Sequence, residues 1–176
     1  MNLEIRQILA PVDLGDSSRP ALRVARLLAE RFGAGITALY VDESLTLETY
    51  DSMFSGSGSA PDREDAPLLN GQAAVDPQVA VAGESPAHAI VRAASRSSAD
   101  LIVMGTHSRR GLRRFLDGSV AETVLRTAGR PVLVVPEISA NAVFGRIVCA
   151  IDGSDASRNA ARFACDLSDQ FGAELI

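Results

Sequence analysis

The chain has 176 residues, of which 47% are hydrophobic and 22% are charged, a composition typical of one globular domain with some residues to spare. Its formal net charge is −5, which argues against nucleic-acid binding. Its 17 basic residues are all arginines, which excludes the phosphate-binding lysine of a Walker A loop. No apolar run is long enough to cross a bilayer, so we expect no membrane partner. No signal-peptide pattern is present, and the two cysteines match neither a disulfide framework nor a zinc site, so we expect a cytoplasmic protein.

The N-terminal part of the chain has the pattern strand, helix, strand. Residues 5–12 are mostly apolar and end at Asp13, which predicts a buried strand. Apolar residues recur at helical spacing over residues 20–32, with a proline in the first turn and Gly33 as the stop signal. Residues 36–41 form the next apolar run. This order predicts a right-handed βαβ unit and therefore a parallel sheet.

Residues 43–77 have a weaker pattern. Apolar residues between 45 and 54 are consistent with a short helix, and residues 55–61 have the Gly-, Ser- and Pro-rich composition of a flexible linker. We expect a short helix followed by a mobile segment, with some helix around residues 68–74.

Beyond this section the chain alternates between strand and helix patterns. The expected strands cover residues 78–82, 101–104 and 131–136, one expected helix starts at Pro86 with Ser85 as its cap, and another runs from about Val120 to Thr127. Together with the first two strands, these elements predict a doubly wound α/β domain with a five-stranded parallel sheet.

The loop after the expected strand at residues 101–104 has features that suit a phosphate group. It contains three glycines and four arginines, and it ends on Ser119-Val120-Ala121-Glu122, a Ser-x-x-Glu capping box that begins the next helix. Glycines let the main chain approach an anion closely, and the N–H groups and dipole of a helix N-terminus favour negative charge. The order strand, glycine-bearing loop, helix therefore predicts a phosphate-binding site.

The C-terminal residues repeat the beginning of the chain with an offset of 139 residues. Asp152 falls on Asp13, and Phe-Gly-Ala at residues 171–173 falls on residues 32–34 without a gap. Matches in one register over this length indicate an internal duplication.

We therefore divide the chain into a first domain, residues 1–138, and the start of a second, truncated copy, residues 139–176, which holds strand one and helix one. One strand and one helix cannot bury a core of their own. This unit should be disordered or docked, either on its own first domain or on a neighbouring chain.

Three stretches have amino-acid sequences close to those of a known family: residues 103–107, 116–122 and 130–135. With these stretches and the repeat, the chain resembles a tandem-type member of the universal stress protein family. Nucleotide-binding members carry a glycine, two residues, a second glycine, nine residues and then Gly-Ser or Gly-Thr. Gly105 and Gly118-Ser119 occupy these places here, and Ser108 stands at the second glycine. The resemblance implies the strand order 3-2-1-4-5, with the topological switch point between strands one and four, where open α/β sheets bind ligands.

The resemblance also implies an adenine nucleotide as ligand, ATP with or without Mg²⁺. The family's binding positions carry over to Pro11, Val12, Asp13, Val41, Met104, Gly105, Ser108, Arg109, Gly118, Ser119 and Val120. Asp13 would accept hydrogen bonds from adenine or ribose, and Val41 and Met104 would form an apolar slot for the base. The glycine loop would bring the phosphates to main-chain N–H donors.

Several interpretations stay open at this point. Asp13 is either a ligand-binding residue or a turn former and helix cap, and the Ser119 hydroxyl is either a phosphate donor or a cap. The sequence has no metal-ligand spacing, hydrolase motif or paired carboxylates, so we expect no enzyme, or at most slow ATP hydrolysis.

The expected function is a nucleotide-dependent signalling or regulatory module of the stress response. The alternative, which Ser108 favours, is a nucleotide-free scaffold whose output is dimerisation. The expected protein contact is pairing through strand five, either as a homodimer or between the two domains of a tandem protein.

Overall fold

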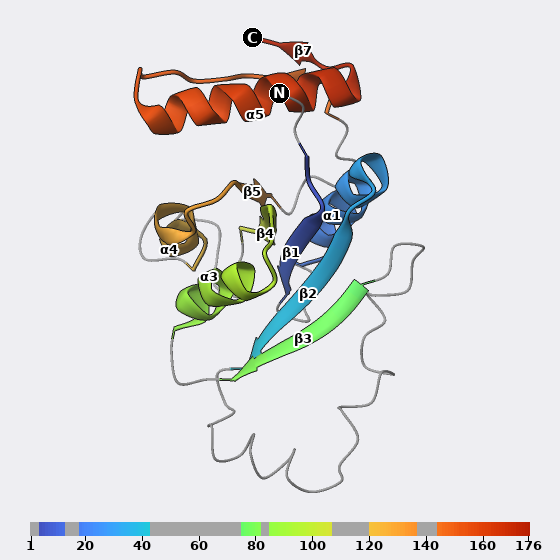
Figure 1. Ribbon diagram of the computed structural model, residues 1–176, viewed down its shortest axis with the longest axis vertical. Helices are drawn as coiled ribbons and strands as arrows, with labels where there is room; N and C mark the ends of the chain where they lie inside the picture. The colour runs from blue at the N-terminus through green and yellow to red at the C-terminus, as the bar shows by residue number, and fades with distance from the viewer. Residues whose placement is uncertain (1–3, 13–17, 43–74, 82–84, 107–119, 137–143) are drawn as a thin grey trace, which may run out of the picture.

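The computed structural model describes residues 4–12, 18–42, 75–81, 85–106, 120–136 and 144–176. Within these ranges five parallel strands form one sheet in the order β3-β2-β1-β4-β5 (Figure 1). The strands are β1 (Gln7–Val12), β2 (Gly35–Asp42), β3 (Val75–Val81), β4 (Leu101–Gly105) and β5 (Val132–Val135). The predicted α/β fold with a parallel sheet is confirmed, and the observed order is the one that the resemblance implied.

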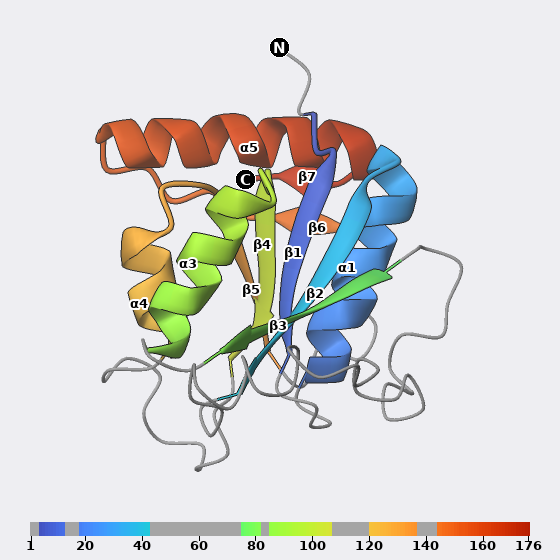
Figure 2. The same cartoon turned by 60° about the horizontal axis from the view of Figure 1, so that its bottom comes forward.

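The described helices of the first domain cover both faces of the sheet. Helix α1 (Arg19–Phe32) lies on one face, and α3 (Pro86–Arg96) and α4 (Val120–Thr127) lie on the other (Figure 2). Successive residues of β1 alternate between the two cores, because side chains along a strand point to opposite faces. Ile8 contributes to the core under α1 and Leu9 to the core under α3 and α4. This double burial explains why the strand is a continuous apolar run.

Helix boundaries follow the predicted signals, with one difference in how the caps work. Helix α1 has its proline in the first turn and ends at Gly33, whose φ of 67° is the left-handed conformation that glycine adopts readily. Helix α3 starts after Ser85, which has the extended conformation of an N-cap but makes no capping bond with its side chain. Its hydroxyl instead contacts the ring of His88, with 3.1 Å between Ser85 Oγ and His88 Nδ1.

Strand β3 begins at Val75, three residues before the predicted start, and contains Pro77. Proline lacks the main-chain N–H that a strand residue donates to its neighbour, so it is found mainly in edge strands. In the described part of the sheet β3 pairs only with β2, and an edge strand tolerates a proline. The helices expected near residues 45–54 and 68–74, and the mobile segment between them, lie outside the described residues.

The repeated segment forms a strand–helix–strand unit of its own. It consists of β6 (Arg146–Ile147), α5 (Asp155–Phe171) and β7 (Glu174–Leu175), and β6 pairs with β7 in parallel. Each strand of this unit is two residues long.

This C-terminal unit packs on the first domain, on the α1 side of the sheet (Figure 1). Leu167 is buried in the core under α1, and Phe163 and Phe171 pack against that core. The Arg31 guanidinium lies 5.9 Å from the centre of the Phe171 ring and donates a hydrogen bond to the Gln170 carbonyl. Of the expected alternatives, docking on its own first domain is the observed one. The proposed domain boundary at residue 138 lies outside the described residues.

None of the helices in the described ranges has the length and apolar character needed to cross a membrane.

Candidate functional site

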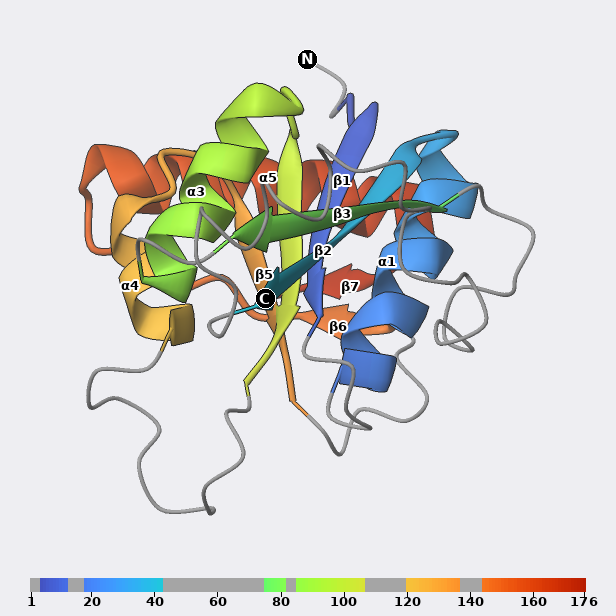
Figure 3. The same ribbon diagram turned by 90° about the horizontal axis from the view of Figure 1, so that it is seen from below.

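The carboxyl ends of β1 and β4 lie side by side at one edge of the sheet. β1 and β4 pair in parallel, with Ile8 opposite Leu101 and Leu9 opposite Ile102. The chain leaves β1 toward α1 on one face and leaves β4 toward α4 on the other. Figure 3 shows this edge, with the ends of both strands and the start of α4 on the same side of the molecule. A crevice opens at such a switch point because the two helices diverge from it.

Two predicted site residues at the end of β1 are half-buried and face opposite sides of the sheet. Val12 packs against the core under α1. Pro11 lies on the other side by strand alternation, the side that Leu9 and Leu39 share. The next strand, β2, carries the predicted site residue Val41 near its end, in register with Ala80 of β3.

Met104 has less access to a ligand than the sequence suggested. Its side chain is only 5% exposed and belongs to the core that Ile90 and Val124 also enter. It therefore packs beneath the edge of the sheet, and very little of its surface is exposed. Gly105, the next residue, is half-buried and ends β4 opposite Val135.

Val120 begins α4 and packs half-buried on the same core as Met104. The first turn of α4 also contains Glu122, whose carboxylate accepts hydrogen bonds from Arg126 at 3.1 and 2.9 Å. This helix runs back from the carboxyl edge of the sheet, so its N-terminal N–H groups lie at that edge. Of the predicted positions, Met104 and Val120 thus share one core, and Gly105 directly follows Met104 at the end of β4.

Five of the eleven predicted positions lie outside the described residues. These positions are Asp13, Ser108, Arg109, Gly118 and Ser119. The glycine cradle and the role of Ser108 consequently stay predictions from the sequence.

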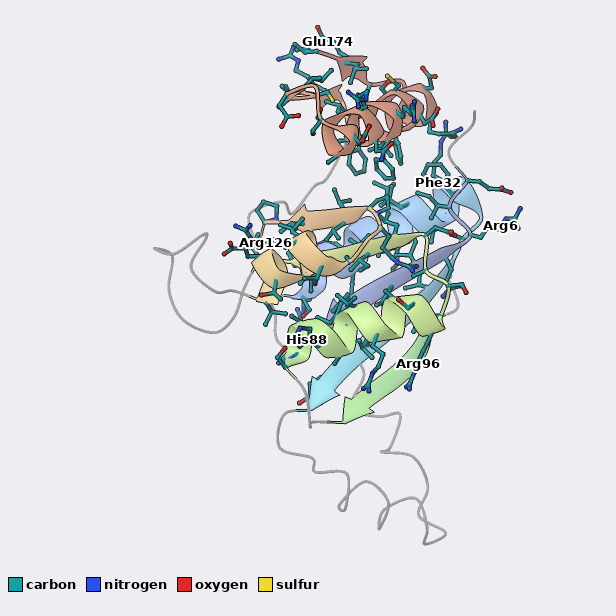
Figure 4. The ribbon with its side chains drawn as sticks, turned by 60° about the vertical axis from the view of Figure 1, so that its left-hand side comes forward. Arg6, Phe32, His88, Arg96, Arg126 and Glu174 are labelled. Atoms are coloured by element: carbon teal, nitrogen blue, oxygen red, sulfur yellow. The ribbon has the colours of Figure 1, made fainter. Side chains whose placement is uncertain are left out.

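The start of α3 adds a polar pair at the same edge that the predicted site did not include. Helix α3 follows the carboxyl end of β3, and Figure 4 shows His88 near the ends of β2 and β3. The exposed His88 ring contacts the Ser85 hydroxyl. The sequence signal for this pair was the spacing of three residues between Ser85 and His88 at a predicted helix start, because residues spaced in this way lie on one side of the first turn.

The C-terminal unit contains Asp152, which the offset of 139 residues pairs with Asp13 in the sequence. Asp152 Oδ1 accepts a hydrogen bond from the Ser154 N–H at 2.9 Å, and the Ser154 hydroxyl accepts one from the Ser157 N–H at 3.1 Å, which caps α5. Hydrogen bonds, chiefly from Ser154, lower the pKa of Asp152 from 3.8 to about 2. Asp152 is therefore a turn former in this copy, and it lines an open cavity of about 460 Å³ together with Ala150 and Ile151.

Among the residues that the structure describes, no group of three or more His, Cys, Asp or Glu side chains could hold a metal ion. Both cysteines are free; Cys149 is half-buried and Cys165 is exposed.

Comparison with known proteins establishes the family. The model of the universal stress protein family matches residues 4–136. A universal stress protein from Methanocaldococcus jannaschii is 36% identical over 145 residues, which cover 74% of this chain and 81% of that protein. The chain belongs to the universal stress protein family.

Solved structures of universal stress proteins show the same fold. One from Archaeoglobus fulgidus aligns with 99% of this chain and 65% of its own length, at a TM-score of 0.71 and 21% identity. That alignment includes the C-terminal unit as well as the first domain. Another from the same organism, solved in complex with dAMP, covers 77% of this chain and 99% of its own at a TM-score of 0.53 and 22% identity. At these identities the likeness concerns the fold alone.

Proposed function

We propose that this universal stress protein binds an adenine nucleotide at the switch point between β1 and β4, and that the bound nucleotide controls its interaction with a signalling partner. The observation that carries the proposal is the pairing of β1 with β4, whose following helices lie on opposite faces of the sheet. The Archaeoglobus fulgidus relative that was solved with dAMP supports an adenine nucleotide as the class of ligand.

Each half of the ligand would contact a different part of the proposed site. Pro11, which is half-buried, and the small exposed part of Met104 would offer an apolar contact for the base at the strand ends. Gly105 leaves room for the ligand to approach the main chain, and the N-terminus of α4 attracts negative charge. Asp13 and the residues from Ser108 to Ser119 complete the proposed site through the family motif, with ATP as the proposed nucleotide.

Calorimetric titration with ATP, with and without Mg²⁺, tests this proposal on the whole chain. We expect saturable binding to the wild type, which Asp13→Ala and Gly118→Val abolish, because one removes the hydrogen-bond acceptor and the other fills the cradle. Arg113→Ala should weaken binding only partly, since this arginine would contribute through long-range attraction to the phosphates. Asp152→Ala is the matched control, because it changes the equivalent aspartate of the second copy.

Absence of wild-type binding at the highest soluble ATP concentration would overturn the proposal. Binding that Asp13→Ala and Asp152→Ala reduce equally would place the ligand elsewhere. We propose a regulatory module instead of an ATPase, and phosphate release that scales with protein and disappears in Asp13→Ala would contradict that part.

A nucleotide-free scaffold is the second candidate function. In the described part of the sheet, β5 is an edge strand that pairs only with β4. An unpaired strand edge is a template for pairing with another chain, and Ser108 at the motif glycine favours a member that functions without nucleotide.

A further inference from the structure

Helix α3 has a row of basic side chains on its solvent-exposed side. The basic row consists of His88, Arg92 and Arg96, which follow one another at intervals of four residues and are all exposed. Residues with this spacing are neighbours on one side of a helix, so the row extends for about 12 Å along the axis. The opposite side of α3 is buried in the core that α4 also enters. Figure 4 shows His88 near the start of the helix and Arg96 near its end.

Among the helices that the structure describes, α3 is the one without an acidic residue. In α4, Glu122 accepts hydrogen bonds from Arg126. In α5, Asp155 pairs with Arg158, and the sequence of α1 contains Glu30. Like charges four residues apart on a helix repel each other, and no carboxylate within α3 offsets this repulsion. The basic row therefore lacks an acidic partner in its own helix, although the chain has a net charge of −5.

The two ends of the basic row are held in different ways. His88 Nδ1 lies 3.1 Å from the Ser85 hydroxyl, which makes no capping bond to α3 and so holds the imidazole ring beside the first turn. Arg96, in the last turn, makes no hydrogen bond or ion pair with any residue that the structure describes. All the donors of its guanidinium are consequently available to an anionic group.

The basic row lies apart from the other contact surfaces of the molecule. The C-terminal unit packs on the α1 side of the sheet, whereas α3 lies on the opposite face (Figure 1). Helix α3 packs on β1 and β2, and β5, the edge strand of the scaffold alternative, lies beyond β4. Neither contact covers the row, so a further partner has access to it.

We propose that the basic row of α3 binds an acidic helix of a partner protein whose carboxylates recur every four residues. A second helix has the same rise per residue, so three such carboxylates also span about 12 Å and each meets one basic side chain. Arginine binds a carboxylate through two parallel hydrogen bonds. His88 adds a donor at Nε2 when the Ser85 hydroxyl donates to Nδ1. Binding would also offset the repulsion between Arg92 and Arg96.

The net charge of the chain favours a short acidic segment over a long polyanion. A nucleic acid would extend past α3 and meet the negative charge of the rest of the molecule, which totals −5 with the arginines included. A single helix needs contact only with the basic row. The inference gives a surface and a chemistry to the partner of the proposed function, but it does not depend on nucleotide binding.

The test measures the fluorescence anisotropy of a labelled alanine-rich helical peptide that has three glutamates at intervals of four residues. The whole chain is titrated into it without nucleotide. We expect saturable binding that weakens as the salt concentration rises, because exposed ion pairs are screened. A peptide of the same composition with its glutamates five residues apart should bind at least about fivefold more weakly, because its carboxylates lie on different sides of the helix. Replacing the glutamates by glutamines should abolish binding.

The matched protein variants remove equal charge at equal spacing from two helices. Arg92→Gln/Arg96→Gln should weaken binding about tenfold, since each exposed ion pair contributes about two- to fivefold. Arg158→Gln/Arg162→Gln, at exposed positions of α5, is the control and should leave binding unchanged. Circular dichroism checks that both variants keep the fold of the wild type.

Three results would overturn the proposal. They are the absence of saturable binding at low salt, equal binding of the peptide with five-residue spacing, and equal loss of binding in the two double variants. ATP titration of the same samples separates this inference from the nucleotide proposal. Wild-type protein that binds the peptide but not ATP would contradict the nucleotide proposal alone, and protein that binds ATP but not the peptide would contradict this inference alone.

Discussion

At the scale of single residues, Asp152 shows what an aspartate contributes where a strand passes into a helix. Its carboxylate holds the turn through Ser154, and Ser154 in turn caps α5. The hydrogen bonds favour the ionised carboxylate, which is why the pKa of Asp152 falls to about 2. The turn is therefore stabilised by a charge that acid can remove.

The pKa shift predicts how the contribution of Asp152 depends on pH. A pKa that is lower in the folded state than its ordinary value of 3.8 adds stability above that value, and this stability is lost as the pH falls from about 4 through about 2. The difference in unfolding free energy between the wild type and Asp152→Ala should accordingly shrink over this range. An NMR titration should place the carboxyl midpoint near 2, and Ser154→Ala should move it back toward 3.8. A midpoint that Ser154→Ala leaves unchanged would contradict the assigned cause.

At the scale of elements, the end of α1 determines how the chain turns back into β2. Gly33 adopts a φ of 67°, and the Gly33 N–H donates to the Ala29 carbonyl. A side chain at this position would meet no atom within 4 Å, so the conformation and not the available space selects glycine. This turn brings β2 beside β1 and so supports one wall of the candidate site.

Gly33→Ala should lower the free energy of unfolding by about 1 kcal/mol, because an L side chain strains a left-handed residue. Chemical denaturation followed by circular dichroism measures the loss. Gly145→Ala is the control, since Gly145 has neither a positive φ nor an atom near its added Cβ, and its stability should stay within about 0.5 kcal/mol of the wild type. Equal losses in the two variants would show that backbone strain at Gly33 is not the cause.

At the scale of the whole molecule, the free side of β5 is the surface that would join two chains if the scaffold function is correct. The Ile102 N–H donates to the Pro131 carbonyl, so the main chain of Leu133 and Val135 faces β4 by alternation. The main chain of Val132 and Val134 then faces outward. Pairing across a twofold axis would use these outward groups.

Light scattering of the whole chain should therefore report a dimer that Val134→Pro converts to a monomer. Proline removes an outward N–H that an intermolecular ladder needs while leaving the carbonyl and N–H groups that bond to β4. The control is Thr127→Ala, at an exposed position of α4, and this variant should remain dimeric. A monomeric wild type would count against pairing through β5.

Much of the fold could be predicted from local patterns. The apolar spacing over residues 120–127 predicts α4 with its observed bounds, and Gly33 marks the end of α1, because helices and their caps depend on residues within a few positions of one another. The start of β3 was predicted too late for the opposite reason. Pro77 fits in β3 because this strand pairs only with β2 in the described part of the sheet, which is a property of the sheet and not of the local sequence.

By itself, the sequence determined the α/β fold, the βαβ units and the family, since each depends on periodicity or on residues in one register, and it predicted an internal repeat. It also pointed to the end of β4 as a site. Only the tertiary structure decided that Met104 is buried beneath that site, because its burial comes from helices distant in sequence. Likewise, only the structure decided that α5 docks beside α1. Both depend on which surfaces come into contact in the folded chain, and a local sequence pattern does not determine such contacts.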